Sequence, residues 1–115
     1  MTPATLRELP NPATRHDYLV RLDGAVGAEA KLTLHYVPDR SIVEAAGFGS
    51  YLDALAEVAQ GTPEVLAARV LEDVNNALVP RWVRVTITHS GHAVLIQDSQ
   101  PDWENDALIS VLSPF

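Results

Sequence analysis

Cysteine is absent from all 115 residues of the chain. The protein therefore has no disulfide, no zinc site built on thiolates and no cysteine nucleophile. Basic residues are also few, since 8 Lys and Arg stand against 15 Asp and Glu, which gives a formal net charge of −7. We do not expect nucleic-acid binding, because phosphate backbones are bound by clustered Lys and Arg.

Long apolar runs are a second absence. No uninterrupted apolar stretch approaches the roughly 18 residues that a membrane span needs, and the N-terminus lacks the basic-then-apolar order of a signal peptide. We therefore expect a cytoplasmic protein that does not bind membranes. Hydrophobic residues make up 47% of the chain and charged residues 20%, which is typical of globular proteins, and the length suits one domain over residues 1–115.

The first third of the chain predicts a hairpin. Residues 1–17 contain three prolines and are expected to form an extended lead-in. A first strand is predicted over Tyr18–Leu22, followed by a turn from Asp23 to Ala28. A second strand is predicted over Lys31–Val37, where apolar and polar residues alternate as in an antiparallel sheet with one buried face.

Two helices are predicted next. The first ends near Gly61 and carries an apolar stripe at helical spacing, at positions Phe48, Tyr51, Leu52, Leu55 and Ala59. The second begins after Thr62, whose side chain is suited to cap the first free amides, with Pro63 at the first helical position. It runs to about Leu78 and is terminated by Pro80.

The last part of the chain predicts a second hairpin. Strands over Val83–Thr88 and Ala93–Ile96 flank a turn at Ser90-Gly91. The resulting ββααββ order predicts an α+β fold, a two-layer antiparallel sheet with both helices on one face. The tail over 99–115 is expected to be irregular, and Ala107–Leu112 within it could be either a short strand or a buried helical turn.

The predicted sheet has two edge strands, whose outward backbone groups lack partners. Several copies of the chain can satisfy these groups by pairing edge to edge, whereas a monomer must cover an edge with its tail. We expect a homo-oligomer that assembles through the edge strands.

Several short motifs lie between Leu6 and Ile96 in a recognisable order and spacing. They are Leu9-Pro10-Asn11-Pro12, Tyr18, Tyr36-Val37-Pro38-Asp39-Arg40, Val43-Glu44-Ala45 and Ala77-Leu78-Val79-Pro80-Arg81-Trp82-Val83. Together they resemble the QueF family of NADPH-dependent 7-cyano-7-deazaguanine nitrile reductases in queuosine biosynthesis. The resemblance implies the tunnelling fold (T-fold), in which several copies join their sheets into a barrel and bind a purine, 7-deazapurine or pterin-like heterocycle between subunits.

The resemblance also implies which residues bind the heterocycle. Glu64, at the start of the second helix, takes the place of a glutamate that grips the ring, since a carboxylate offers two acceptors to a ring N–H and an exocyclic amine. Val43, Glu44 and Ala45 map to a Val-Glu-Ser stretch that contacts the base, although Ala45 lacks the serine hydroxyl. The alternatives are that Glu64 only complements the helix dipole and that Glu44 is a solvated loop charge.

The catalytic parts of the family are missing. Nitrile reduction begins with a cysteine thiolate on a segment between the first two strands, where this chain has only Asp23 to Glu29 and no cysteine. The Arg-Gly-Gly stretch associated with the cofactor phosphate reads Ser90-Gly91-His92, so the phosphate-pairing arginine is absent. We therefore expect neither nitrile reductase activity nor NADPH, and no other cofactor.

His89 and His92 flank the predicted Ser90-Gly91 turn, where two imidazoles could contribute to a zinc site. A zinc site needs at least one more protein ligand, and His35 cannot be placed well enough to supply it. We expect both histidines to be polar hairpin residues and expect no metal site.

Three functions remain open. The first is a heterocycle-binding protein anchored by Glu64, without nitrile reductase activity. The second is an enzyme of altered acid–base chemistry in the same pocket, using Glu64 with His89 or His92. The third is a non-catalytic structural or regulatory subunit. We rank them in this order.

Overall fold

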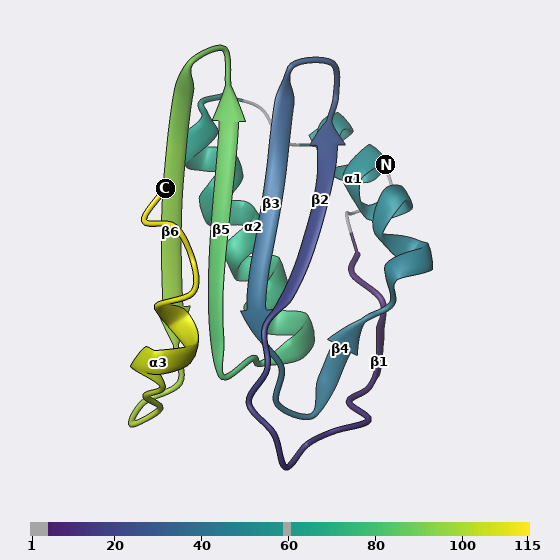
Figure 1. Cartoon of the computed structure of the whole chain (residues 1–115). Helices are drawn as coiled ribbons and strands as arrows, with labels where there is room; N and C mark the ends of the chain where they lie inside the picture. Colours follow the sequence, from purple (N-terminus) through teal and green to yellow (C-terminus); the bar gives the residue numbers. More distant parts are fainter. Residues whose placement is uncertain (1–4, 59–60) are drawn as a thin grey trace.

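The structure is a computed structural model that describes residues 5–58 and 61–115. Four antiparallel strands form its main sheet, in the order β2-β3-β5-β6 (Figure 1). Their bounds are β2 Val20–Val26, β3 Ala30–Val37, β5 Trp82–His89 and β6 His92–Ser99. Both predicted hairpins are confirmed, and β2 and β6 are the edges of this sheet.

Helices α1 (Phe48–Val58) and α2 (Pro63–Leu78) pack on one face of the sheet (Figure 1). α1 contacts β2, whereas α2 contacts β5 and β6, and a short 3-10 helix, η1 (Ala45–Gly47), leads into α1. The predicted α+β architecture, a two-layer antiparallel sheet in ββααββ order, is therefore confirmed. Ala59, the last position of the predicted helical stripe, lies outside the described residues. Within the described part of the chain, no helix is long and apolar enough to cross a membrane.

The core lies between the main sheet and the two helices. Leu32, Leu34 and Tyr36 of β3 are each exposed by 1% or less, which confirms the alternation predicted for this strand. The layer is completed from β5, α1 and α2 by Val83, Val85, Ile87, Tyr51, Leu55, Ala67, Val70 and Val74. Removal of these apolar side chains from water is the main source of the fold's stability.

β2 is longer than the sequence predicts. The expected turn from Asp23 to Ala28 is wrong in its first part, because β2 continues to Val26 and only residues 27–29 turn. Gly24 lies inside β2 under α1, and a Cβ atom there would be 2.1 Å from the Cδ1 atom of Leu52. This glycine therefore permits close packing of the helix on the strand and does not mark a turn.

Both ends of α2 are fixed. The Thr62 hydroxyl accepts a hydrogen bond from the Val65 amide at 3.4 Å and Pro63 is the first helical residue, as predicted. At the other end, the cap residue Val79 has φ 45° and ψ 58°, a left-handed conformation that β-branched residues rarely adopt. The Gln100 side-chain amide donates to the Val79 carbonyl at 3.1 Å and helps to hold this conformation.

The structure also contains a second, two-stranded sheet, which the sequence did not predict. It pairs β1 (Glu8–Pro10), in the lead-in, with β4 (Ser41–Val43). Each strand has three residues, which is too short for an alternating pattern to be recognised.

The C-terminal tail contains helix α3 (Asp106–Ile109), so this segment is helical in part, but none of the helix residues is buried, and the expected burial of the turn is wrong. The Asn105 side chain caps the helix by accepting from the Leu108 amide at 3.1 Å. Figure 1 shows the tail in front of β5 and β6, on the face of the sheet opposite to α2.

Candidate functional site

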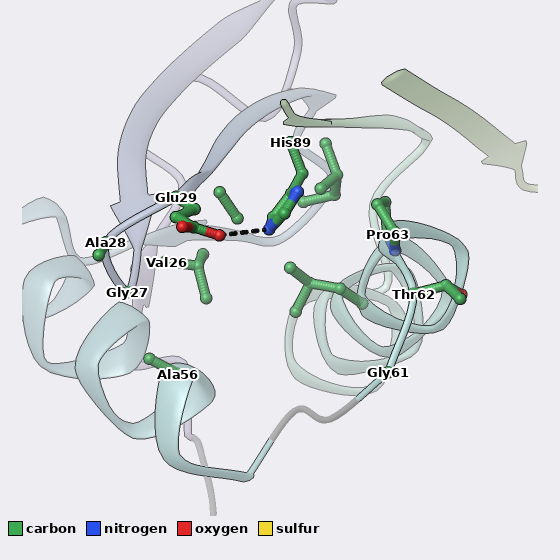
Figure 2. A pocket seen from close by; sticks show the side chains of 12 residues that line it. Val26, Gly27, Ala28, Glu29, Ala56, Gly61, Thr62, Pro63 and His89 are labelled. Carbon is green, nitrogen blue, oxygen red and sulfur yellow. Dashed lines mark ion pairs between the residues drawn. The ribbon is translucent and has the colours of Figure 1, made fainter. Parts of the chain in front are cut away.

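A cavity of about 320 Å³ lies where the β2–β3 turn, the end of β5 and the start of α2 meet (Figure 2). Figure 2 shows Ala56 of α1 and Pro63 of α2 on different sides of it. Its apolar lining comes from Val26, Ala30, Ala56, Leu66 and Ile87. A cavity of this size that combines apolar side chains with polar groups is typical of a small-molecule site.

An ion pair joins two of the residues that line this cavity. The Oε2 atom of Glu29, in the β2–β3 turn, lies 3.2 Å from the Nε2 atom of His89, in β5 (Figure 2). The Glu29 side chain is 69% exposed and that of His89 is 40% exposed. An exposed pair of this kind contributes at most about 1 kcal/mol, so either group can exchange its partner for a ligand at little cost.

Glu64 forms a second carboxylate–imidazole pair nearby. Its Oε1 atom lies 3.2 Å from the Nε2 atom of His92, and its side chain is 60% exposed. Glu64 does not line the cavity, although Thr62 and Pro63, just before it, do. The pKa of Glu64 lies below its usual value, chiefly because its carboxylate accepts a hydrogen bond from the backbone amide of the same residue, and His92 adds to this. The carboxylate is therefore ionised at neutral pH and can only accept hydrogen bonds.

The β5–β6 turn places the two histidines as predicted. Ser90 and Gly91 have φ values of 48° and 81°, as in the two-residue turns that favour hairpins, and His89 pairs directly with His92 across the ladder. The two imidazoles nevertheless bind different carboxylates. Over residues 5–58 and 61–115, no group of three or more His, Asp or Glu side chains is arranged to hold a metal ion.

Val43, Glu44 and Ala45 are at the other end of the molecule. Val43 is a buried residue of β4, and its amide donates to the Tyr36 hydroxyl at 2.8 Å. The Glu44 amide donates to the Arg7 carbonyl at 2.8 Å, and Ala45 is exposed at the start of η1. None of the three lines the cavity, so a single chain does not bring them to Glu64.

Four of the other residues that carry the QueF resemblance, namely Asn11, Tyr18, Asp39 and Arg81, form a hydrogen-bonded network at that same far end. Asn11 is buried there, and its side chain donates to the Asp39 carbonyl at 2.7 Å and accepts from the Tyr18 hydroxyl. The Arg81 guanidinium donates to two carbonyls of the lead-in and lies 3.0 Å from Asp17 and 3.4 Å from Asp39. This network joins the lead-in to the sheet and takes no part in the cavity lining.

Glu29 is the one acidic residue among the described residues that line the cavity, and sequence analysis did not select it. It lies in a turn without a motif, and only the pairing of Ala30 with His89 brings it opposite the end of β5. The order of the strands in the sheet could have revealed Glu29, because neighbouring antiparallel hairpins place their turns at the same end of the sheet.

A scan against protein-family models and a search of curated proteins find no match to the chain.

Proposed function

We propose that the chain is a cytoplasmic, QueF-like protein that binds a small flat nitrogen heterocycle of the purine, 7-deazapurine or pterin kind, without nitrile reductase activity. One observation carries the proposal. A cavity of about 320 Å³, lined by both apolar and polar groups, has at its rim the carboxylate of Glu29, which pairs with the half-exposed His89.

The residues that line the cavity suit both the apolar faces and the polar edge of such a ligand. Apolar side chains such as Leu66 and Ile87 contact the faces of the ring, and the Glu29 carboxylate accepts from an N–H and an amine on its edge. Hydrogen bonds to a charged group contribute about 1.5–3 kcal/mol each. Releasing His89 costs at most about 1 kcal/mol, so the exchange favours the ligand.

Glu64 is the second acceptor in this proposal. Binding to one edge of the ring requires Glu64 to release His92, which is an exposed partner like His89. Val43, Glu44 and Ala45 lie at the far end of the protomer from Glu64. A site that contains Glu64 together with these three residues therefore requires two copies of the chain. The edge strands β2 and β6 offer the backbone groups through which these copies pair.

The sequence supports the proposed lack of nitrile reductase activity. Attack on a nitrile carbon needs an activated nucleophile, and no cysteine is present. The β2–β3 turn, where the resemblance places the catalytic segment, consists of residues 27–29 alone.

Calorimetric titration with guanine, 7-cyano-7-deazaguanine and neopterin tests the proposal. We expect one of them to bind, and we expect Glu29→Gln and Glu64→Gln to weaken that binding at least tenfold, or about 1.4 kcal/mol for Glu29. Glu72→Gln is the matched control, because it removes the same charge from an exposed position of α2. Heat from none of the three ligands would contradict the proposal, and a monomer in light scattering would contradict its intersubunit part.

A second candidate is acid–base catalysis on the bound heterocycle. The observation that favours it is the pairing of each imidazole with a carboxylate, at 3.2 Å for both Glu29–His89 and Glu64–His92. Mass spectrometry of the heterocycle after incubation with the protein distinguishes the two functions. Conversion that Glu64→Gln abolishes supports catalysis, whereas recovery of unchanged ligand supports binding alone.

A further inference from the structure

A second cavity, of about 330 Å³, lies on the face of the sheet that α1 and α2 leave open. Its walls include Arg21 of β2, His35 of β3, Arg84 of β5 and Leu95 of β6. The C-terminal segment 111–115 covers part of it. This cavity is separated from the heterocycle cavity by the sheet and the core, so the two are independent.

The two arginines of this cavity have different kinds of partner. Arg21 is neutralised by Asp23, whose two carboxylate oxygens lie 2.9 and 3.3 Å from its guanidinium nitrogens. Arg84 instead donates to two neutral acceptors, the Gln97 side chain at 3.1 Å and the Ser113 carbonyl at 2.9 Å. Over the described residues, no carboxylate lies within ion-pair distance of Arg84.

His35 lines the same cavity. Its Nδ1 atom is buried and has no hydrogen-bond partner among the described residues, an arrangement that costs free energy. Burial, and then the nearby Arg21 and Arg84 guanidinium groups, hold the pKa of His35 below its ordinary value. The imidazole is therefore neutral at neutral pH, and a bound anion would favour its protonated form.

We propose that this cavity binds a small organic anion, a carboxylate or phosphate monoester attached to an apolar group, with Arg84 as its principal partner. A guanidinium presents parallel N–H donors that match the oxygens of either head group. Leu95 and Leu112 line the cavity and contact the apolar part. The volume lies at the small end of the range for ligand pockets, which favours a compact ligand.

Titrations with phenyl phosphate, benzoate and inorganic phosphate, followed by NMR of the protein, test this proposal. We expect at least one of the two aromatic anions to bind more tightly than inorganic phosphate, because only they have an apolar group, and the tighter of the two identifies the preferred head group. Arg84→Gln should weaken binding at least tenfold, whereas Arg15→Gln, at an exposed position of the lead-in, should leave it unchanged. Ligand saturation should raise the pKa of His35 in the wild type.

Four results would overturn the proposal. They are equal affinities of the wild type and Arg84→Gln, absence of binding by both aromatic anions, inorganic phosphate binding at least as tightly as both, and a His35 pKa that saturation leaves unmoved. If Arg84→Gln does not fold, Arg84→Lys keeps the charge and loses the two-pronged geometry, and the expected loss is then severalfold. Unchanged binding in a folded Arg84→Lys would count against the role of the guanidinium.

Discussion

The two ends of the main sheet differ in how their polar side chains are held. At the end where α2 finishes, Asn11 is 7% exposed, and both Asn11 and Arg81 bind several partners. At the end where α2 begins, Glu29 pairs with His89, and Glu64 pairs with His92 and accepts from its own backbone amide; the two side chains are 69% and 60% exposed. Hydrogen-bonded groups that are shielded from water stabilise a fold, whereas exposed ion pairs contribute little to stability and remain available to a ligand.

This contrast assigns the residues behind the QueF resemblance to two roles. Asn11, Tyr18, Asp39 and Arg81 join the lead-in to the sheet, which is a structural role. Glu64 lies at the opposite end and belongs to the proposed site. Substitutions at the two ends should therefore separate stability from binding.

The largest effect is expected from Arg81→Ala. This change leaves the Asp17 and Asp39 carboxylates without their shared cation and removes two hydrogen bonds to lead-in carbonyls. Loss of such a shielded network should lower the free energy of unfolding by about 3 kcal/mol, measured by urea denaturation. Arg15→Ala, which removes an exposed arginine from the same lead-in, should change it by less than about 0.5 kcal/mol. Equal losses of unfolding free energy in Arg81→Ala and Arg15→Ala would contradict the structural role of the Arg81 network.

Asn11→Ala should have the next largest effect. It leaves the Asp39 carbonyl, the Ala13 amide and the Tyr18 hydroxyl without their partner. We expect a loss of about 2 kcal/mol in the free energy of unfolding in water. The m-value, which is the slope of that free energy against urea concentration, should stay unchanged. The control is Asn76→Ala, an exposed position of α2, and a loss no greater than this control's would contradict the structural role of Asn11.

The contribution of Asp17, which pairs with Arg81, to the free energy of unfolding should also depend on pH. Burial alone would raise the pKa of Asp17, but hydrogen bonds from Asn105 and Arg81 and the charge of Arg81 together lower it below its ordinary value of 3.8. A carboxyl with a lowered pKa stabilises the fold above that ordinary value, and this contribution is lost as the pH falls through the folded-state pKa. The difference in unfolding free energy between wild type and Asp17→Asn should therefore shrink as the pH falls from about 6 to about 2. A difference that stays constant would show that Asp17 does not titrate in this way.

The smallest effect on stability is expected at the other end. A Glu29→Gln, Glu64→Gln double variant loses two exposed ion pairs and should keep the wild-type melting temperature. The same variant should lose ligand binding. A clear drop in melting temperature would instead make these carboxylates structural.

Local patterns predicted much of the fold. The alternation of Leu32, Leu34 and Tyr36 and the Thr62-Pro63 helix start depend on neighbouring residues alone, and both are confirmed. Gly24 was misinterpreted as a turn residue because its role depends on Leu52, which is distant in sequence.

The candidate site was less accessible to sequence reasoning. The spacing of His89 and His92 around a two-residue turn predicted their pairing across the hairpin. Their partners Glu29 and Glu64 come from other elements, and only the order of the strands and the packing of α2 bring them together.

One measurement addresses the central claim directly. Amide chemical shifts recorded during titration with 7-cyano-7-deazaguanine, guanine and neopterin should change at Glu29, Leu66 and His89, around the cavity, while those of Asn11 and Arg81 stay fixed. Changes confined to the Asn11–Arg81 end, or no change with any of the three ligands, would contradict the assignment of ligand binding to the end where α2 begins.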